Sequence, residues 1–178
     1  MNAPQSERTL KALIGLLLAV FVFVIYDSVH ENIVVVGDSA PGFTVTTDSG
    51  RSVTLGNFGG KLLVLNFWAT WCPPCIQEIP SLNQFQRRFK DAGVVVLGVS
   101  IDKDEKVYKS FLSKAQVAFL TSRDPEAKIN AEYGTAKVPE TYIIDTKGKV
   151  VQKLIGPQDW NDPSILRDVQ ALLRSSAS

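Results

Sequence analysis

The chain has 178 residues, 45% of them hydrophobic, which is enough for one folded domain with a sizeable core and additional segments. Its formal net charge is +1, so the composition gives no indication of nucleic-acid binding. Both cysteines lie in a single Cys-x-x-Cys motif, which leaves none for a structural disulfide elsewhere.

A long apolar segment lies near the N-terminus, at residues 12–26, and contains no charged side chain. Together with residues 9–11 it has 18 residues, or about 27 Å of helix against the ~30 Å hydrocarbon core of a membrane. Arg8 and Lys11 precede it, and no Lys or Arg follows until Arg51. The positive-inside rule then predicts a cytoplasmic N-terminus at 1–11, a transmembrane signal-anchor at 12–26, and a single-pass protein of the inner membrane whose folded domain faces the periplasm or outer side.

A cleaved signal peptide is the main alternative for this segment, because its apolar region can reach ~15 residues. No small-x-small cleavage site is evident around residues 26–30, and we therefore expect the segment to stay attached. A buried helix of a soluble protein fits less well, because the segment is apolar on every side.

The folded domain is expected at residues 37–178, after a tether at 27–36. His30, the single histidine, lies in the tether, where we expect an exposed polar side chain rather than a metal ligand. The domain begins with two short strand patterns, residues 43–46 and 52–55, which flank a turn and predict a hairpin.

Strands and helices then alternate along the chain. Apolar runs predict two buried strands, at residues 62–65 and 94–101. Apolar periodicity predicts two helices, at residues 76–89 and 107–115. Two Asp-Pro pairs predict the starts of two further helices, one at residues 124–134 and one that begins at residue 162. Between these helices, residues 141–145 and 150–155 predict a second hairpin. This order predicts an α/β fold with a mixed central sheet flanked by helices and an N-terminal β-hairpin extension.

The Cys-x-x-Cys motif stands where a strand ends and a helix begins. Cys72 lies at the start of that helix, whose free N–H groups and positive dipole end favour a thiolate over a thiol. Cys75, one turn on, lies on the same side, so the pair can close a disulfide and reopen it. The alternative, half of a zinc site, lacks ligands, because the chain has one histidine and no second Cys-x-x-Cys. We predict a redox pair with no metal or other cofactor.

The motif and its surroundings resemble the thioredoxin superfamily, and more narrowly its membrane-anchored TlpA/ResA-like branch of thiol-disulfide oxidoreductases, which includes reductases of cytochrome c maturation. Four stretches carry this resemblance: Gly37-x-x-Ala40-Pro41-x-Phe43, Asn66-Phe67-Trp68-Ala69-Thr70-Trp71-Cys72, Cys75-x-x-Glu78-x-Pro80 and Val138-Pro139-Glu140-Thr141. The last of them is more similar to the cytochrome c maturation subgroup than to TlpA-like proteins in general. The resemblance covers about residues 36–173 and implies a thioredoxin-like fold.

The resemblance also implies roles for individual residues. Cys72 is implied as the nucleophile, and Cys75 as the resolving thiol that releases a reduced partner from the mixed disulfide. The peptide bond between Val138 and Pro139 is implied to be cis and to face the cysteines, so that the Val138 backbone pairs with the partner's extended chain. Trp71 is expected to contact the partner. The implied partners are exported proteins with disulfides, among them apocytochrome c, and a membrane thiol-disulfide relay that supplies electrons.

Glu78 is the third candidate catalytic residue. It follows Cys75 by one helical turn, and a buried carboxylate there could exchange a proton with that thiol. An exposed acid that favours the helix dipole fits the spacing equally well. The resemblance, in which a Glu at this place tunes the active site, favours the functional interpretation. Ordinary thioredoxin has a buried Asp where this chain has Asn66, which cannot take up a proton, so we expect Glu78 to replace it.

Three alternatives to a reductase fit the sequence less well: a strong oxidant, a peroxidase and a copper-binding module. The residues between the cysteines, Pro73 and Pro74, carry no group that stabilises a thiolate, which favours a reductase over a strong oxidant. A peroxiredoxin-like peroxidase needs Thr three residues before its reactive cysteine, where this chain has Ala69. A non-enzymatic copper-binding module of thioredoxin fold would need a wider cysteine spacing and a histidine from the domain.

Overall fold

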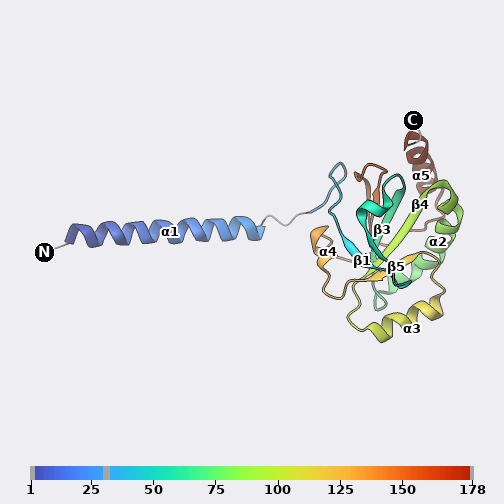
Figure 1. Cartoon of the computed structure of the whole chain (residues 1–178), viewed down its shortest axis with the longest axis horizontal. Helices are drawn as coiled ribbons and strands as arrows, with labels where there is room; N and C mark the ends of the chain where they lie inside the picture. Colours follow the sequence, from blue (N-terminus) through green and yellow to red (C-terminus); the bar gives the residue numbers. More distant parts are fainter. Residues whose placement is uncertain (1–2, 30–32, 177–178) are drawn as a thin grey trace. The chain divides into compact units, whose positions relative to one another are not determined.

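The computed structural model describes residues 3–29 and 33–176, which form two units that divide between Asn32 and Ile33 (Figure 1). His30, in the middle of the predicted tether, lies outside the described residues. In chain order the helices and strands are α1 (Ala3–Val29), β1 (Thr44–Thr46), β2 (Ser52–Thr54), the 3₁₀ turn Leu55–Phe58, β3 (Leu62–Trp68), α2 (Pro73–Phe89), the 3₁₀ turn Lys90–Ala92, β4 (Val94–Ser100), α3 (Glu105–Ala115), β5 (Leu120–Arg123), α4 (Lys128–Glu132), β6 (Glu140–Ile144), β7 (Val150–Ile155) and α5 (Pro163–Ser176).

The N-terminal unit consists of α1, which contains the apolar segment at 12–26 and extends beyond both its ends. Its large apolar side chains between Leu10 and Ile25 are exposed. Within the described ranges, no helix combines the length and the hydropathy that crossing a membrane requires. The transmembrane helix expected at 12–26 is therefore not supported, and the uninterrupted apolar run has 15 residues where a span needs about 20.

The second unit is built around a five-stranded sheet with the order β5-β4-β3-β6-β7. β3, β4 and β5 run parallel, and β6 and β7 are antiparallel to their neighbours. β1 and β2 form a separate antiparallel pair with Val45 opposite Val53. The structure thus confirms the mixed sheet and the N-terminal β-hairpin.

Side chains of the central strand β3 alternate between two layers of core. Leu62 and Val64 pack with α2, α3 and α5 in one hydrophobic cluster. Leu63 and Leu65 pack with β1 and α4 in the other. Because side chains of a strand alternate with a period of two, Asn66 shares the face of Val64 and points toward α2.

Two elements differ from the sequence expectations. β5 was not predicted, because its four residues include Thr121 and Ser122 and lack an apolar run. The helix expected from Asp124 begins at Lys128 instead, because Ala127 adopts a left-handed conformation with φ 51°. Asp124 still caps this segment, since its Oδ2 accepts a hydrogen bond of 2.8 Å from the Ile129 N–H.

The domain also begins earlier than residue 37. Val34 is buried, and its N–H donates to the carbonyl oxygen of Tyr133 at 3.2 Å. The N–H of Gly37 donates to the carbonyl oxygen of Val150 at 2.8 Å. These contacts attach the last residues of the predicted tether to the folded unit, which starts at Ile33.

Candidate active site

Cys72 is the residue that caps the N-terminus of α2, directly after the loop that follows β3. Pro73 and Pro74 occupy the first helical positions, where a missing N–H costs nothing. The N–H of Cys75 donates to Cys72 Sγ at 3.3 Å. The two sulfur atoms are joined in a disulfide, so the expected redox pair is present in its oxidised form.

The two cysteines differ in access from solvent. Cys75 has no exposed surface, whereas Cys72 is 5% exposed. Trp71, which precedes Cys72, is 63% exposed, in contrast to the buried Trp68. Cys72 is therefore the more accessible of the two sulfur sites, and Trp71 is the exposed side chain next to it.

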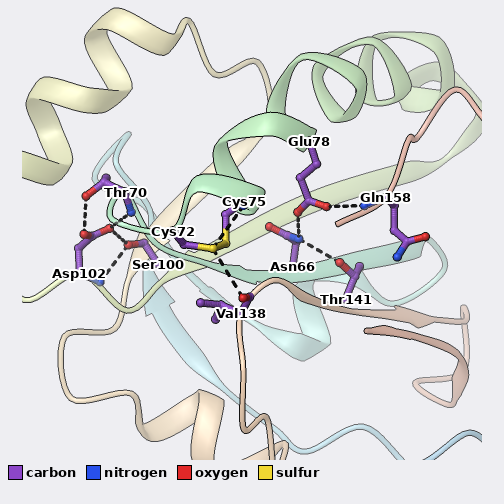
Figure 2. The surroundings of a disulfide bond; sticks show 10 residues. All are labelled: Asn66, Thr70, Cys72, Cys75, Glu78, Ser100, Asp102, Val138, Thr141 and Gln158. Carbon is purple, nitrogen blue, oxygen red and sulfur yellow. Dashed lines mark hydrogen bonds between the residues drawn. A yellow bond between two sulfur atoms is a disulfide. The ribbon is translucent and has the colours of Figure 1, made fainter. Parts of the chain in front are cut away.

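The segment before β6, which is distant from the cysteines in sequence, lies next to the disulfide in the fold. Glu140 lies opposite Phe67 in the antiparallel β3–β6 pair, so the residues just before it arrive where β3 ends. The Val138-Pro139 peptide bond is cis, as the resemblance implied. The carbonyl oxygen of Val138 lies 3.6 Å from Cys72 Sγ (Figure 2) and can accept a hydrogen bond from the thiol once the disulfide opens.

Glu78 is buried against β3 rather than exposed on the helix surface, with 3% of its surface exposed. Its Oε1 accepts a hydrogen bond of 2.8 Å from Asn66 Nδ2, and its Oε2 accepts one of 3.1 Å from the Gln158 N–H. Asn66 Nδ2 also donates to Thr141 Oγ1 at 2.9 Å. The hydrogen bonds of the carboxylate thus connect α2 to β3 and to the loop after β7, and Asn66 extends the network to β6, as Figure 2 shows.

Burial is the main influence on the charge of Glu78. Loss of hydration raises the pKa of this carboxyl group, and the donors on Gln158 and Asn66 oppose the rise. The indole of Trp160 adds a weaker opposing influence, although its Nε1 makes no hydrogen bond of normal geometry. A raised pKa favours the neutral carboxyl group, which can hold a proton one helical turn after Cys75 in α2.

A second buried carboxylate, Asp102, holds the loop before Cys72 and was not singled out from the sequence. Its oxygens accept hydrogen bonds from the Thr70 N–H at 2.9 Å and from Thr70 Oγ1 at 2.6 Å. Ser100 Oγ donates to the same carboxylate at 2.5 Å. In the view of Figure 2 these bonds and those of Glu78 lie on opposite sides of the disulfide. The sequence did contain a signal for Asp102, because it lies just after β4. The parallel strands β3 and β4 end at the same edge of the sheet, so an acid after β4 is expected near the loop after β3.

Metal ligation finds no support in the described part of the chain, where no group of three or more His, Cys, Asp or Glu side chains is close enough to hold an ion. The site itself contains the Cys72–Cys75 pair, with Glu78 as a titratable group one helical turn after Cys75.

The chain is similar to known proteins in sequence and in structure. The model of the AhpC/TSA family matches residues 36–153. Thiol-disulfide oxidoreductase ResA of Bacillus cereus is 37% identical over 123 residues, covering 69% of this chain and 71% of the relative. ResA of Geobacillus kaustophilus is 31% identical over 164 residues, covering 91% and 94%.

Among solved structures, a Chlorobium tepidum protein assigned as the thiol:disulfide interchange protein DsbE matches with a TM-score of 0.74. The identity is 31%, and the match covers 79% of this chain and 99% of that chain. The relatives and this structural neighbour therefore agree on a thioredoxin-like fold and on thiol-disulfide exchange as the chemistry.

Proposed function

Since the chain belongs to the AhpC/TSA family and is a thiol-disulfide oxidoreductase of the ResA type, we propose that it works as a reductase of disulfides in exported proteins, including apocytochrome c. The observation that carries the proposal is the position of Cys72 Sγ, at the N-terminus of α2 and 3.6 Å from the Val138 carbonyl oxygen. Exposed Trp71 stands beside it as a contact for a protein substrate.

In the reductive direction the cycle starts from the dithiol. The Cys72 thiolate attacks one sulfur of the substrate disulfide, that bond breaks, and the other substrate sulfur leaves as a thiolate that takes up a proton. Cys75 then loses its proton and attacks Cys72 Sγ, which releases the second substrate sulfur as a thiolate that is protonated in turn. Two electrons pass to the substrate, and the Cys72–Cys75 disulfide seen here is the product on the enzyme.

Glu78 is proposed to act on the second of these steps. It lies one helical turn after Cys75, it is buried, and burial raises its pKa, so it can hold a proton near the resolving thiol. Its hydrogen bonds go to Asn66 and Gln158. Glu78 is therefore proposed to act on Cys75 through its charge and by exchanging a proton with the Cys75 thiol, which becomes free to titrate when the disulfide opens.

The direction and the partners of the reaction rest on the surroundings of the cysteines. Between them stand two prolines, and the one donor that reaches Cys72 Sγ from within the motif is the Cys75 N–H, so the thiolate receives little extra stabilisation. Pro139-Glu140-Thr141 supports apocytochrome c as a substrate through its similarity to the cytochrome c maturation subgroup. Electrons are proposed to come from a membrane thiol-disulfide relay.

Attachment to the inner membrane, with the domain on the periplasmic or outer side, is part of the proposal. It is supported by the exposed apolar side chains of α1 and by the basic residues Arg8 and Lys11 that precede them. Covering the apolar side chains on all sides of this helix with lipid removes them from water, which is favourable.

The full chain carrying Cys75→Ala tests the function in the host cell. It should accumulate mixed disulfides through Cys72 with exported proteins that contain paired cysteines, identified by non-reducing electrophoresis and mass spectrometry. The matched Cys72→Ala chain should trap none, because Cys75 has no exposed surface. The wild-type pair should be found mostly as a dithiol by mass-tag alkylation, and a pair kept mostly oxidised would overturn the reductive direction.

A further inference from the structure

An open groove lies beside the active-site loop. It is formed by the loop before α2, the segment between β4 and α3, and the turn before α4, and its volume is about 950 Å³. Small-molecule sites typically measure ~300–1,000 Å³, so this groove has room for several side chains of a peptide. It shares Thr70 and Trp71 with the loop that carries Cys72.

The wall of the groove next to Cys72 is held in place by buried hydrogen bonds. Asp102, 3% exposed, accepts bonds from both the N–H and the Oγ1 of Thr70. Ser100 Oγ donates to the same carboxylate. This fixes the loop before Trp71 against the end of β4, so the groove exists before a partner arrives and the ordering cost on binding is reduced.

The lining of the groove combines apolar surface with acidic groups. Ile101 and Pro125 contribute apolar walls, and Val107 and Trp71 are 52% and 63% exposed. Two exposed acidic side chains, Asp104 and Glu126, and one exposed basic side chain, Lys103, line the groove, and the carboxylate of Asp102 is buried behind them.

The acidic character is not reversed by the start of α3. The Asp104 carboxylate accepts from the N–H groups of Lys106 and Val107, so it satisfies the helix end that would otherwise attract an anion. Glu126 is paired with Lys128 at 2.6 Å, but both side chains are largely exposed, and such pairs exchange partners at little cost.

We propose that this groove binds the segment of the substrate polypeptide next to its reactive disulfide, and that it selects segments with a large apolar side chain beside a Lys or Arg. The apolar side chain lies against Trp71 and Val107, and the cation lies near Asp104 and Glu126. The inference rests on the proposed function, because the groove shares Thr70 and Trp71 with the loop that carries Cys72 and so lies within reach of residues that flank a bound substrate sulfur.

Four short peptides, each closed by one disulfide, test the selection on the full chain in detergent. They differ at two positions beside one cysteine: Leu-Lys, Leu-Glu, Ser-Lys and Ser-Glu. Reduction is followed with dithiothreitol as the final reductant, and hydroxyethyl disulfide serves as a small substrate without flanking residues. The Leu-Lys peptide should show the highest kcat/KM, and its advantage over Leu-Glu should shrink as salt screens the charges.

Two variants with the same change in net charge locate the effect. Glu126→Lys reverses a charge in the groove, whereas Glu132→Lys reverses an exposed charge outside its lining. The ratio of kcat/KM for Leu-Lys over Leu-Glu should fall about tenfold in Glu126→Lys, because an attraction becomes a repulsion, and should stay near wild type in Glu132→Lys. Val107→Ser should reduce the preference for Leu over Ser.

The possible failures can be told apart. Equal rates for the four peptides, or equal changes in the two lysine variants, with hydroxyethyl disulfide still reduced, would overturn the groove and leave the reductase intact. If the wild-type chain reduces no disulfide, hydroxyethyl disulfide included, the proposed function fails and the groove proposal fails with it.

Discussion

The two cysteines differ in burial, and their variants should differ accordingly. Cys72→Ser removes the accessible sulfur and should lower insulin reduction to the rate of dithiothreitol alone. Cys75→Ser keeps the attacking thiolate but removes the thiol that resolves the mixed disulfide, so the enzyme should stop as a covalent complex. Ser113→Ala, on the exposed side of α3, is a control that should turn over normally. Near-native activity in both cysteine variants would contradict the assignment.

Glu78 should influence the thiols through its charge. When ionised, this buried carboxylate disfavours a second negative charge on a nearby thiolate and so raises the coupled pKa values of the thiols. Glu78→Gln is expected to lower those pKa values and to slow the resolving step. The measurement is the rate of thiol alkylation against pH, together with turnover. Glu132→Gln removes a surface acid as a control, and a Glu78→Gln profile that superimposes on wild type would show that the acid has no role in proton transfer.

The same residue should shape the pH dependence of stability. Burial raises the pKa of Glu78 above its ordinary value of 4.5. The folded state therefore keeps a proton that the unfolded chain has released, and the contribution to the free energy of unfolding falls as pH rises from about 4.5 through the folded-state pKa. Glu78→Gln lacks this contribution. The difference in unfolding free energy, wild type minus variant, should decline across that window in urea titrations of the oxidised protein, and parallel curves would contradict it.

At the residue scale the sequence predicted the cysteine pair well and the carboxylates poorly. Cys72 and Cys75 could be assigned because their spacing at a helix start has few other uses. The environment of Glu78 could not be decided, because its spacing from Cys75 places it one turn further along α2 without showing whether its carboxyl group is buried. The alternation along β3 decides it, since it turns Asn66 toward α2 and supplies the donor at 2.8 Å.

At the scale of elements, helices with strong apolar periodicity were predicted correctly, and the short polar strand β5 was not. The starts of α2 and α5 agree with the prediction, because Pro stands in the first turn of both and Cys72 and Asp162 accept bonds from backbone N–H groups. β5 has four residues and takes its place through pairing with β4, a long-range contact that local sequence does not encode.

The stability of the domain should depend on one hydroxyl group, that of Thr70, which ties the loop before Cys72 to the end of β4. Thr70→Val keeps the shape of the side chain and removes the 2.6 Å hydrogen bond to buried Asp102. The free energy of unfolding should drop by about 1–2 kcal/mol, because the carboxylate loses a donor that water does not replace. Thr70→Ser retains the hydroxyl group and should keep most of that free energy. Urea unfolding with an unchanged m-value checks this, and equal stabilities of the Val and Ser variants would show the bond to be unimportant.

For the whole molecule, the site lies at one edge of the sheet because of strand direction. β3, β4 and β5 are parallel, so their last residues lead to Cys72, Asp102 and Asp124 at the same edge. β6 runs the other way, so its first residues bring Val138 to this edge as well. The sheet order thus explains why groups from distant parts of the sequence meet around one disulfide.

The N-terminal unit carries the last prediction. Both core clusters of the domain draw their residues from Val34 onward, so a chain that starts at Ile33 should fold and reduce insulin without α1. The full chain should instead be recovered with membranes, because the exposed apolar side chains of α1 favour lipid over water. Its intact mass should include residues 1–26, and protease added to the outer face of spheroplasts should digest the domain.

Each outcome of that experiment separates one alternative for the N-terminus. A membrane-bound chain with full mass and a protected domain would reverse the orientation that Arg8 and Lys11 indicate. A mass lacking residues 1–26 would show a cleaved signal peptide, and the relay would then have to meet a free domain. A full-length chain in the soluble fraction would contradict attachment itself and require another cover for the apolar surface of α1.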